Sequence, residues 1–237
     1  ADLPLVEPVL KLSGHAEAVR SVAWAADMQL LASSSSDETA RVWDVGIGLC
    51  VAVLKPSADE IMDLCFCDGQ LLTASSDKTL RLWNCSKGAK GQAEPEPEPE
   101  PEPETGASSD SPSSTWVEIA TMRGHSNGLR RCRAHPNGQL ALSASDDGSV
   151  RLWNLRDAAA SDPPAGHEDA VTACVLCQRR GEMVVVSADS AGNAQCQPAA
   201  GEATGTLWRV HVSSVSPSCK AIAALSSCGD ATIACAM

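Results

Sequence analysis

The sequence predicts an all-β fold made of about five repeated four-stranded units, and three observations support this prediction. A short polar cluster, a tight turn and an alternating strand that ends in Trp occur three times, which is the local pattern of a β-hairpin. Short apolar runs separated by brief polar breaks continue through the remaining sequence. The first and third copies align without a gap at a constant offset of 110 residues. Because an internal repeat sets the architecture, we expect each repeat to form one antiparallel sheet.

Each copy carries the same polar positions at the same spacing. A Ser or Thr lies four residues before an Asp, and the Asp lies six residues before a Trp. In chain order these residues are Ser33, Asp37 and Trp43, then Thr73, Asp77 and Trp83, then Ser143, Asp147 and Trp153. The first and third copies also have a Gly-His pair 29 residues before the Trp, counted from the Gly.

The first two units are expected to lie before residue 85. The first has predicted strands at 9–12, 19–24, 30–33 and 39–44, and the second at 49–54, 61–66, 71–74 and 79–84. Asp68-Gly69 is the dipeptide of a tight hairpin turn. Pro56-Ser57 stands where the first unit has Gly14-His15, so the second unit lacks the histidine.

The third unit is regular and the fourth is degraded. The third has predicted strands at 116–122, 129–134, 140–143 and 149–154. The fourth keeps Gly166-His167, with predicted strands at 171–176 and 183–188. Its first strand would fall at 158–164, where two consecutive prolines weaken strand pairing. Ser190 and Cys196 stand where the Asp and the Trp are expected.

The fifth unit is fainter still. Predicted strands fall at 206–210, 212–216, 221–225 and 231–235, and Gly229-Asp230 supplies a turn. The closing Trp is missing, and Ala236 lies near its place.

Residues 86–115 interrupt the repeats. Residues 94–104 alternate strictly between Glu and Pro, which excludes both a helix and a strand ladder and favours an extended polyproline-II spacer. We interpret this stretch as a disordered surface insertion, with an acidic arm that docks on a basic partner as the alternative. The predicted organisation is one propeller-sized domain with repeats 1 and 2 at 1–85, the insertion at 86–115 and repeats 3 to 5 at 116–237.

Composition disfavours several classes of protein. A net charge of −12 repels phosphate backbones, so nucleic acid is not an expected partner. No signal peptide opens the sequence, and no apolar run approaches the roughly 18 residues of a membrane span, so we expect no membrane partner. The 11 cysteines are an odd number and favour a reducing interior. We therefore expect a cytoplasmic protein, and the Ala-rich, Tyr-free composition leads us to suggest a cytoskeletal or ciliary assembly.

Two cysteine pairs are the candidate metal ligands. They are Cys65-x-Cys67 and Cys174-x-x-Cys177. Structural zinc takes four ligands, commonly as two close pairs, and no His-Cys partner pair lies at a useful spacing. We therefore assign these cysteines to packing, with Cys65 and Cys67 on one side of a strand and Cys174 and Cys177 on opposite sides. No cofactor is expected, because no Gly-rich phosphate loop or nucleophile elbow is present.

The repeated residues resemble the WD-repeat family of β-propellers. The resemblance rests on Gly14-His15 with Trp43-Asp44, on Gly124-His125 with Trp153-Asn154, and on Asp77 with Trp83-Asn84. It implies four-stranded blades in which the strand before each Gly-His completes the outer edge of the preceding blade. By this rule residues 9–12 would pair with the last blade and close the ring.

The number of units departs from the family pattern, because seven blades are usual and we count about five. Three interpretations follow: a closed five-bladed ring, a piece of a longer chain, or an open arc that a partner completes. We favour the second and third together, because closing five blades would distort a pattern shaped for wider rings.

Two sets of residues have the types found in a hydrolase triad. They are Ser33, His15 and Asp37, and Ser143, His125 and Asp147. The resemblance implies instead that His, Ser or Thr, Asp and Trp form a hydrogen-bonded relay within each blade. An enzyme needs only one site, so a set repeated in successive units indicates architecture, and no catalytic residue is expected. Thr73, Asp77 and Trp83 lack a His, so their relay should be weaker.

The resemblance implies a non-enzymatic scaffold that binds other proteins within a larger intracellular complex. We expect partner contacts on the face that bears the Gly-His turns and the turns between second and third strands. The candidates are Glu17, Arg20, Ser36, Ser76, Asn127, Arg130 and Asp146. The alternative is a substrate receptor of a cullin-RING ubiquitin ligase, because Trp153 to Arg156 nearly match the Trp-Asp-x-Arg signature of such receptors.

Overall fold

A computed structural model describes residues 10–56, 58–87, 114–135, 137–160, 166–179, 182–198, 208–211, 224–228 and 232–236. Every regular element in these ranges is a β-strand. All strand pairs are antiparallel, and they form five sheets. We call the first four sheets blades 1 to 4.

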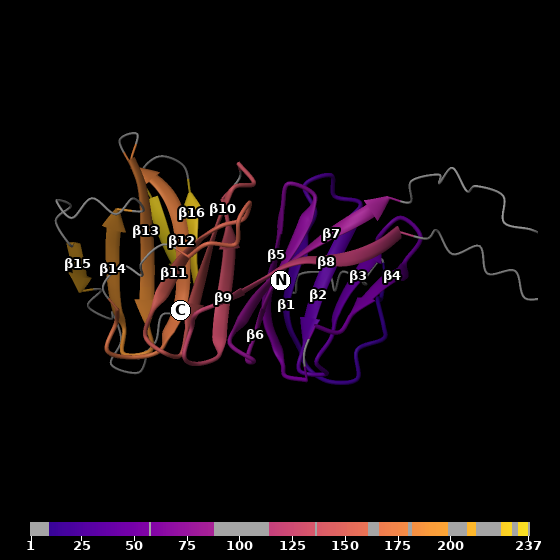
Figure 1. Cartoon of the computed structure of the whole chain (residues 1–237), viewed down its shortest axis with the longest axis horizontal. Coiled ribbons are helices and arrows are strands. Elements are labelled where there is room, and N and C mark those ends of the chain that lie inside the picture. The colour runs from indigo at the N-terminus through magenta and orange to yellow at the C-terminus, as the bar shows by residue number, and fades with distance from the viewer. Residues whose placement is uncertain are drawn as a thin grey trace, which may run out of the picture.

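Blades 1 and 2 are complete four-stranded meanders (Figure 1). Blade 1 consists of β1 (Val19–Trp24), β2 (Leu30–Ser35), β3 (Ala40–Asp44) and β4 (Leu49–Leu54). Blade 2 consists of β5 (Ile61–Cys67), β6 (Gln70–Ser75), β7 (Thr79–Lys87) and β8 (Ser114–Arg123). The long strands β7 and β8 pair from Thr79 with Arg123 to Lys87 with Ser114, so one hairpin carries the Glu-Pro stretch, which lies outside the described residues.

The later sheets are less regular. Blade 3 has three strands, β9 (Leu129–Ala134), β10 (Leu140–Ser145) and β11 (Val150–Asn154). Blade 4 has four, β12 (Val171–Arg179), β13 (Glu182–Asp189), β14 (Asn193–Pro198) and β15 (Trp208–His211). The fifth sheet pairs β16 (Ala224–Cys228) with β17 (Thr232–Ala236).

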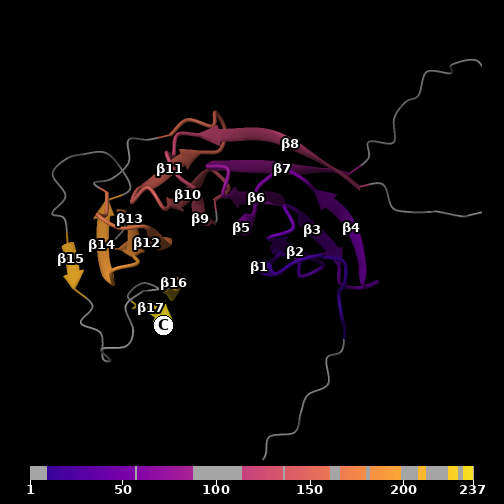
Figure 2. The ribbon, with the colours of Figure 1, turned by 90° about the horizontal axis from the view of Figure 1, so that it is seen from below.

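The sheets follow one another around an open arc, which Figure 2 shows from below. The first strand of each sheet lies on the inside, so β1 packs on β5, β5 on β9, β9 on β12, and β12 on β16. No comparable packing joins β1 to the fifth sheet among the described elements. The predicted all-β fold, an incomplete propeller, is therefore confirmed.

Several predicted strands differ from the observed ones. Residues 10–12 form no strand; instead the side chain of Leu10 lies against Gly48, in the β3–β4 turn of its own blade. The prediction that this segment pairs with the last blade is therefore wrong for its described residues. The predicted strand at 158–164 is reduced to a single bridge, from Trp153 to Ala160, in the described part of that stretch, as expected from the two prolines.

The last predicted unit is shifted. β15 begins at Trp208 and pairs with β14, so it completes blade 4, as the offset between repeats and blades implies. β16 begins at Ala224 rather than residue 221, and β17 at Thr232 rather than residue 231. The predicted strand at 212–216 lies outside the described residues.

The core is a series of apolar layers between neighbouring blades. One layer joins blades 1 and 2, including Ala32, Val42 and Leu64. A second joins blades 2 and 3, and a third joins blades 3 and 4. Each blade is therefore stabilised mainly by its neighbours, so contact between blades decides where the arc is stable.

The β10–β11 turn of blade 3 contacts the segment that leads into blade 4. Gly148 has a φ of +79°, a region that favours glycine, and its carbonyl accepts the His167 N–H at 2.7 Å. A Cβ at Gly148 would lie 2.5 Å from the His167 carbonyl oxygen.

We expect Gly148→Ala to lower the free energy of unfolding by clearly more than the ~1–2 kcal/mol of a left-handed alanine alone, because backbone must also move. Gly69→Ala is the matched control, since Gly69 has a φ of +76° but nothing within 4 Å of the added Cβ. Urea denaturation measures both, and equal losses would contradict the predicted clash.

Candidate functional site

In blade 1 the predicted polar residues meet in a chain of hydrogen bonds. His15 Nδ1 lies 2.9 Å from Asp37 Oδ2, and His15 Nε2 lies 2.7 Å from Ser33 Oγ. Trp43 Nε1 donates to the same Ser33 oxygen at 2.8 Å. The Thr39 hydroxyl donates to Asp37 Oδ1 at 2.6 Å. These hydrogen bonds connect the segment before β1 to β2, to β3 and to the turn between β2 and β3.

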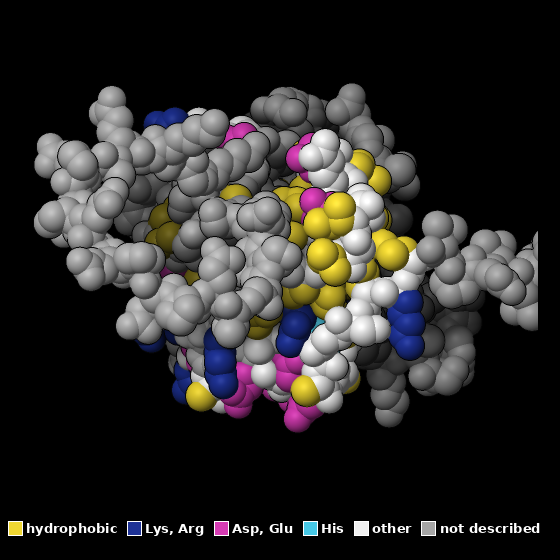
Figure 3. All heavy atoms as spheres, turned by 90° about the vertical axis from the view of Figure 1, so that its right-hand side faces the viewer, with side chains coloured by type: hydrophobic (Ala, Val, Ile, Leu, Met, Phe, Trp, Pro, Cys, Tyr) yellow, Lys and Arg dark blue, Asp and Glu magenta, His cyan; other side chains and the backbone are white. Residues whose placement is uncertain are grey.

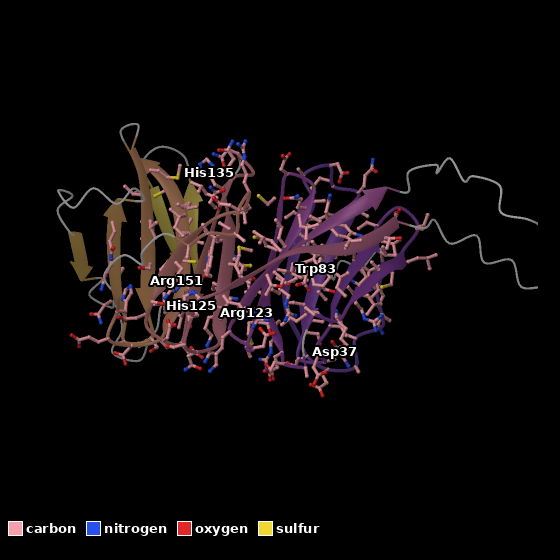
Figure 4. The ribbon with its side chains drawn as sticks, in the orientation of Figure 1. Asp37, Trp83, Arg123, His125, His135 and Arg151 are labelled. Atoms are coloured by element: carbon pink, nitrogen blue, oxygen red, sulfur yellow. The ribbon has the colours of Figure 1, made fainter. Side chains whose placement is uncertain are left out.

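Blade 3 repeats this arrangement bond for bond. His125 Nδ1 lies 3.0 Å from Asp147 Oδ2, and its Nε2 lies 2.7 Å from Ser143 Oγ. Trp153 Nε1 donates to Ser143 Oγ at 2.7 Å, and the Ser149 hydroxyl donates to Asp147 at 2.6 Å. Figure 4 labels His125, which lies at the same end of the blades as Asp37, whereas His135 lies at the other end.

The donors fix which nitrogen of His125 carries the proton. The indole N–H of Trp153 only donates, so Ser143 Oγ accepts it and its own hydroxyl is free to donate to Nε2. Nδ1 then carries the hydrogen and donates to Asp147. A protonated ring would place two donors on Ser143 Oγ and leave the serine hydroxyl without this acceptor. The relay therefore favours neutral histidine.

Burial agrees with the neutral form. Desolvation lowers the pKa of His125 and outweighs the opposing attraction of Asp147. Burial alone would raise the pKa of Asp147, but hydrogen bonds from Ser149 and from the backbone of Ser126 hold it well below the usual range. The site is a neutral imidazole against a carboxylate.

These directions predict that the fold loses stability in acid. The folded pKa of His125 lies below the unfolded value of about 6.5, so its contribution is present above that pH and is lost as the pH falls. The carboxylate of Asp147 contributes in the same sense below about pH 4. We expect a lower urea midpoint at pH 5 than at pH 7, and a smaller difference in His125→Gln. The control is His135→Gln, and an unchanged difference in His125→Gln would contradict the account.

Blade 2 uses an arginine where the histidine is missing. Trp83 Nε1 donates to Thr73 Oγ1 at 3.0 Å, as in the other blades. Asp77 instead accepts from Arg81 Nη2 at 3.0 Å. In blade 1 the matching arginine, Arg41, lies under Gly14, where an added Cβ would be 2.7 Å from its Nη1. The relay of blade 2 thus has a different partner for its Asp.

Blade 4 keeps a relay that the sequence analysis placed wrongly. His167 Nδ1 lies 2.9 Å from Asp189 Oδ2, and His167 Nε2 lies 2.8 Å from Ser187 Oγ. Asp189, rather than Ser190, therefore takes the Asp position. The separation from His to Asp is 22 residues in blades 1, 3 and 4, whereas the separation from His to Ser is 18, 18 and 20. The constant His-to-Asp spacing was the signal that could have found Asp189.

The Trp position of blade 4 was also misplaced. Ser187 pairs with Gln195 as Ser33 pairs with Arg41, so Gln197 rather than Cys196 occupies the register of the Trp. Gln195 and Gln197 are both buried, and Gln197 Nε2 donates to Gln195 Oε1 at 2.9 Å.

Five of the predicted partner-binding residues lie in turns or bends near these relays, whereas Arg20 and Arg130 lie at the starts of β1 and β9. Arg20 Nε donates to Ser36 Oγ at 2.7 Å, and Arg130 Nε lies 2.7 Å from Asp146. Arg20 also reaches Glu60 of blade 2 at 2.9 Å, a residue that the sequence analysis missed because nothing in the repeat pattern distinguishes it.

The other three candidates, Ser76, Asn127 and Glu17, take no part in these arginine contacts. The backbone of Ser76 packs against Gly128, where an added Cβ would be 3.2 Å away. Asn127 Oδ1 accepts the Gly128 N–H at 2.9 Å, and Glu17 is exposed. Contact between these residues and another protein remains a prediction.

Cys65, Cys67, Cys132 and Cys174 pack in the layers between blades. Cys65 Sγ lies 3.9 Å from Cys132 Sγ of the next blade. Burial raises the pKa of Cys67 to about 11 and that of Cys174 to about 12, so both thiols stay protonated near neutral pH. Within the described ranges no three His, Cys, Asp or Glu side chains are placed to hold a metal ion. The described residues also contain no helix long and apolar enough to cross a membrane.

Comparison with known proteins identifies the repeats. The family model described as WD domain, G-beta repeat, matches residues 6–44, 48–84 and 116–154. The chain is 31% identical over 163 residues to nuclear distribution protein PAC1-2 of Uncinocarpus reesii, covering 53% of this chain and 36% of that protein.

Two further similar proteins are named for other cellular processes. The ribosome biogenesis protein WDR12 homolog of Anopheles gambiae is 30% identical over 70% of this chain and 34% of its own length. The target of rapamycin complex subunit wat1 of Schizosaccharomyces pombe is 24% identical over 69% of this chain and 43% of its own. The chain therefore spans between about a third and a little over two fifths of these relatives.

Proposed function

Because three of its repeats are WD40 repeats, this chain is a WD-repeat protein, and we propose that it is a non-enzymatic scaffold in a multi-subunit assembly. The observation that carries the proposal is that each Ser, His and Asp of the two triad-like sets is hydrogen-bonded within its own blade. Ser33 and Ser143 are buried, each accepting from a Trp and bonded to a His. What the chain offers to other molecules is then the surface of its blades and turns.

The names of the relatives support a shared surface rather than a shared pathway. They refer to nuclear distribution, to ribosome biogenesis and to a subunit of the target of rapamycin complex. Because these are three different processes, the feature that the proteins have in common is the set of repeats. Assembly with other proteins is the function that this feature serves best.

The proposal is tested by purifying the tagged chain from its own cells and treating it with a fluorophosphonate serine-hydrolase probe. We expect stoichiometric partner proteins and no labelling of Ser33 or Ser143, because both serines are buried and each Oγ already accepts a hydrogen bond from a Trp. Labelling of either serine, or recovery of the chain without partners, would contradict the scaffold.

We further propose that the assembly is cytoplasmic and belongs to the cytoskeleton or the cilium. The support is the composition described above, together with the relative named for nuclear distribution. Fluorescence imaging of the tagged chain tests this finer proposal. Diffuse or nuclear signal without any microtubule or ciliary structure would remove it and leave the scaffold intact.

A second candidate function rests on the turn after β11. Arg156 is exposed there, and its backbone N–H donates to Asn154 Oδ1 at 3.0 Å, so the side chain projects from an ordered turn. A substrate receptor of a cullin-RING ligase would use this arginine to bind the adaptor. Arg156→Ala should then abolish co-purification with the adaptor complex while Arg123→Ala, also exposed, should not. Unchanged association in Arg156→Ala would exclude this candidate.

A further inference from the structure

Two cysteines meet at the interface between blades 2 and 3. The Cys65 thiol, on β5, donates to Cys132 Sγ, on β9, at 3.9 Å. β5 and β9 are the first strands of consecutive blades and pack directly on each other. Cys132 is fully buried in the apolar layer, whereas Cys65 packs against the same layer and stays partly exposed. Two thiols in contact across an interface are the starting geometry for a disulfide.

Strand register shows that this thiol pair is specific to one interface. Cys65 pairs with the residue before the relay Thr of blade 2, and Cys132 pairs with the relay Ser of blade 3. The same two positions hold Ala23 and Leu64 at the interface between blades 1 and 2, and Arg133 and Cys174 at the interface between blades 3 and 4. Packing of repeated blades therefore does not require two thiols at these positions.

Blade 1 has the position that matches Cys132 on the open side of the arc. It holds Val22, which pairs with Ser33 and is 60% exposed. Figure 3 views the molecule from the side on which blade 1 lies and shows hydrophobic side chains gathered there. Because the cysteine pair lies between blades 2 and 3, its chemistry does not depend on what covers blade 1.

The two thiols differ in how readily an oxidant reaches them. Contact with Cys65 and burial raise the pKa of the Cys132 thiol, and the positive charge of Arg133 only partly opposes this shift. Cys132 is therefore a poor first target. Cys65 is partly exposed, so a small oxidant can reach its sulfur, and exposure is one of the properties that decide which cysteine is oxidised.

We propose that Cys65 and Cys132 form a reversible redox pair, which hydrogen peroxide oxidises to a disulfide between blades 2 and 3. The Cys65 sulfur first attacks a peroxide oxygen, so that an S–O bond forms, the O–O bond breaks, and the leaving hydroxide takes the thiol proton as water. The Cys132 sulfur then attacks the Cys65 sulfur, so that the S–S bond forms and the S–O bond breaks. The second hydroxide takes the Cys132 proton and leaves as water. Two electrons pass from the sulfurs to the peroxide.

The disulfide would restrain the unfolded chain over a long loop. The two cysteines are 67 positions apart, and β6, β7, the Glu-Pro stretch and β8 lie between them. Closing so long a loop lowers the entropy of the unfolded chain, so oxidation should stabilise the arc at this interface. In a reducing compartment such a bond forms only transiently. The pair would thus respond to oxidation, and the inference is independent of the proposed scaffold function.

Peptide mapping of the intact chain tests the pair. The tagged protein is isolated from its own cells with and without brief exposure to hydrogen peroxide, its remaining thiols are alkylated in denaturant, and unreduced peptides are analysed by mass spectrometry. We expect a peptide linked through Cys65 and Cys132 that appears on exposure and is lost with dithiothreitol. Cys85→Ser is the matched control, because Cys85 is another partly exposed thiol of blade 2 but lies in the layer between blades 1 and 2. It should leave the linked peptide unchanged.

A second variant separates the two steps. Cys132→Ala keeps the layer apolar but removes the second thiol, so Cys65 should stop at the sulfenic acid, which dimedone traps. We expect the dimedone adduct on Cys65 to increase about tenfold or more over that in the unsubstituted chain. The oxidised unsubstituted chain should also have a urea midpoint about 1 M higher than its reduced form, whereas Cys132→Ala should show no such rise.

The contrary results are equally specific. Linkage of Cys65 to any other cysteine overturns the inference, as does a peptide map that is unchanged at an exposure sufficient to oxidise cellular glutathione. Oxidation of Cys65 to a sulfinic acid without the linked peptide also overturns it, and so does a disulfide form whose urea midpoint is no higher. Each of these results leaves the scaffold proposal intact, because that proposal is tested by the recovery of partner proteins.

Discussion

Replacing Trp153 with Ala is expected to lower the free energy of unfolding by about 3–5 kcal/mol. Trp153 is among the largest fully buried side chains of the described residues, 1% exposed, and it lies in the layer between blades 2 and 3. Its loss would open a cavity in that layer and remove the donor to Ser143. Urea denaturation followed by circular dichroism measures the loss.

Two further variants separate packing from hydrogen bonding. Trp153→Phe keeps most of the volume but leaves Ser143 Oγ without the indole donor, so we expect a loss of about 1–3 kcal/mol. Trp24→Ala removes an indole that is 46% exposed and should cost only about 0.5 kcal/mol. A Trp153→Ala loss no larger than that of Trp24→Ala would contradict the layered core.

Replacing Asp63 with Ala is expected to cost about 3 kcal/mol. Asp63 is 1% exposed, and its Oδ2 accepts both from the Cys132 backbone N–H at 3.0 Å and from Arg133 Nη1 at 2.7 Å. These bonds run from blade 2 to blade 3, so the change leaves a buried N–H without its acceptor at the blade interface. The partly exposed Arg133 keeps some contact with water, which limits the loss.

Asp146→Ala is the matched control for this ion pair. Asp146 also pairs with an arginine, Arg130, at 2.7 Å, but both side chains are partly exposed. Exposed ion pairs contribute about 0–1 kcal/mol, so Asp146→Ala should be nearly neutral. Similar urea midpoints for Asp63→Ala and Asp146→Ala would show that the pair between blades adds no stability.

The regular repeats could be predicted from the sequence because local pattern and packing agree there. The predicted strand at 129–134 is observed unchanged, and Asp68-Gly69 forms the expected hairpin turn with both residues at positive φ. Alternating apolar residues, a turn dipeptide and a closing Trp all indicate the same register. Strand ends moved by one to three residues, because hydrogen bonding continues where side-chain pattern stops.

The fourth blade shows where local pattern fails. Counting back from Cys196 placed the Asp at Ser190, because the spacing from Asp to Trp was assumed constant. The β12–β13 hairpin is longer than its counterparts in blades 1 and 3, whereas the turn after β13 keeps the register of the turn after β2. The Asp of the relay therefore lies closer in sequence to the Ser than in the other blades, at Asp189. The pairing of Arg81 with Asp77 could not be predicted from the sequence either. The direction in which this arginine side chain points depends on whether a histidine already occupies the site beside the Asp.

The predicted strand at 9–12 is not observed in its described residues, 10–12, for a different reason. Its apolar residues suit a strand, but a strand needs a neighbouring edge, and none of the described sheets brings one to it. Leu10 instead packs on Gly48. Whether such a segment forms a strand is decided by the far end of the arc, which local sequence does not encode.

The free energies of unfolding of Ser33→Ala and Ser143→Ala, measured side by side in urea, test most directly whether the triad-like sets are architecture. Each serine accepts from a Trp and contacts a His at nearly the same distances. We predict that both substitutions cost about 1–3 kcal/mol, in similar amounts. A substitution at either serine that leaves stability unchanged or raises it would contradict this account, because such behaviour is typical of a strained functional site.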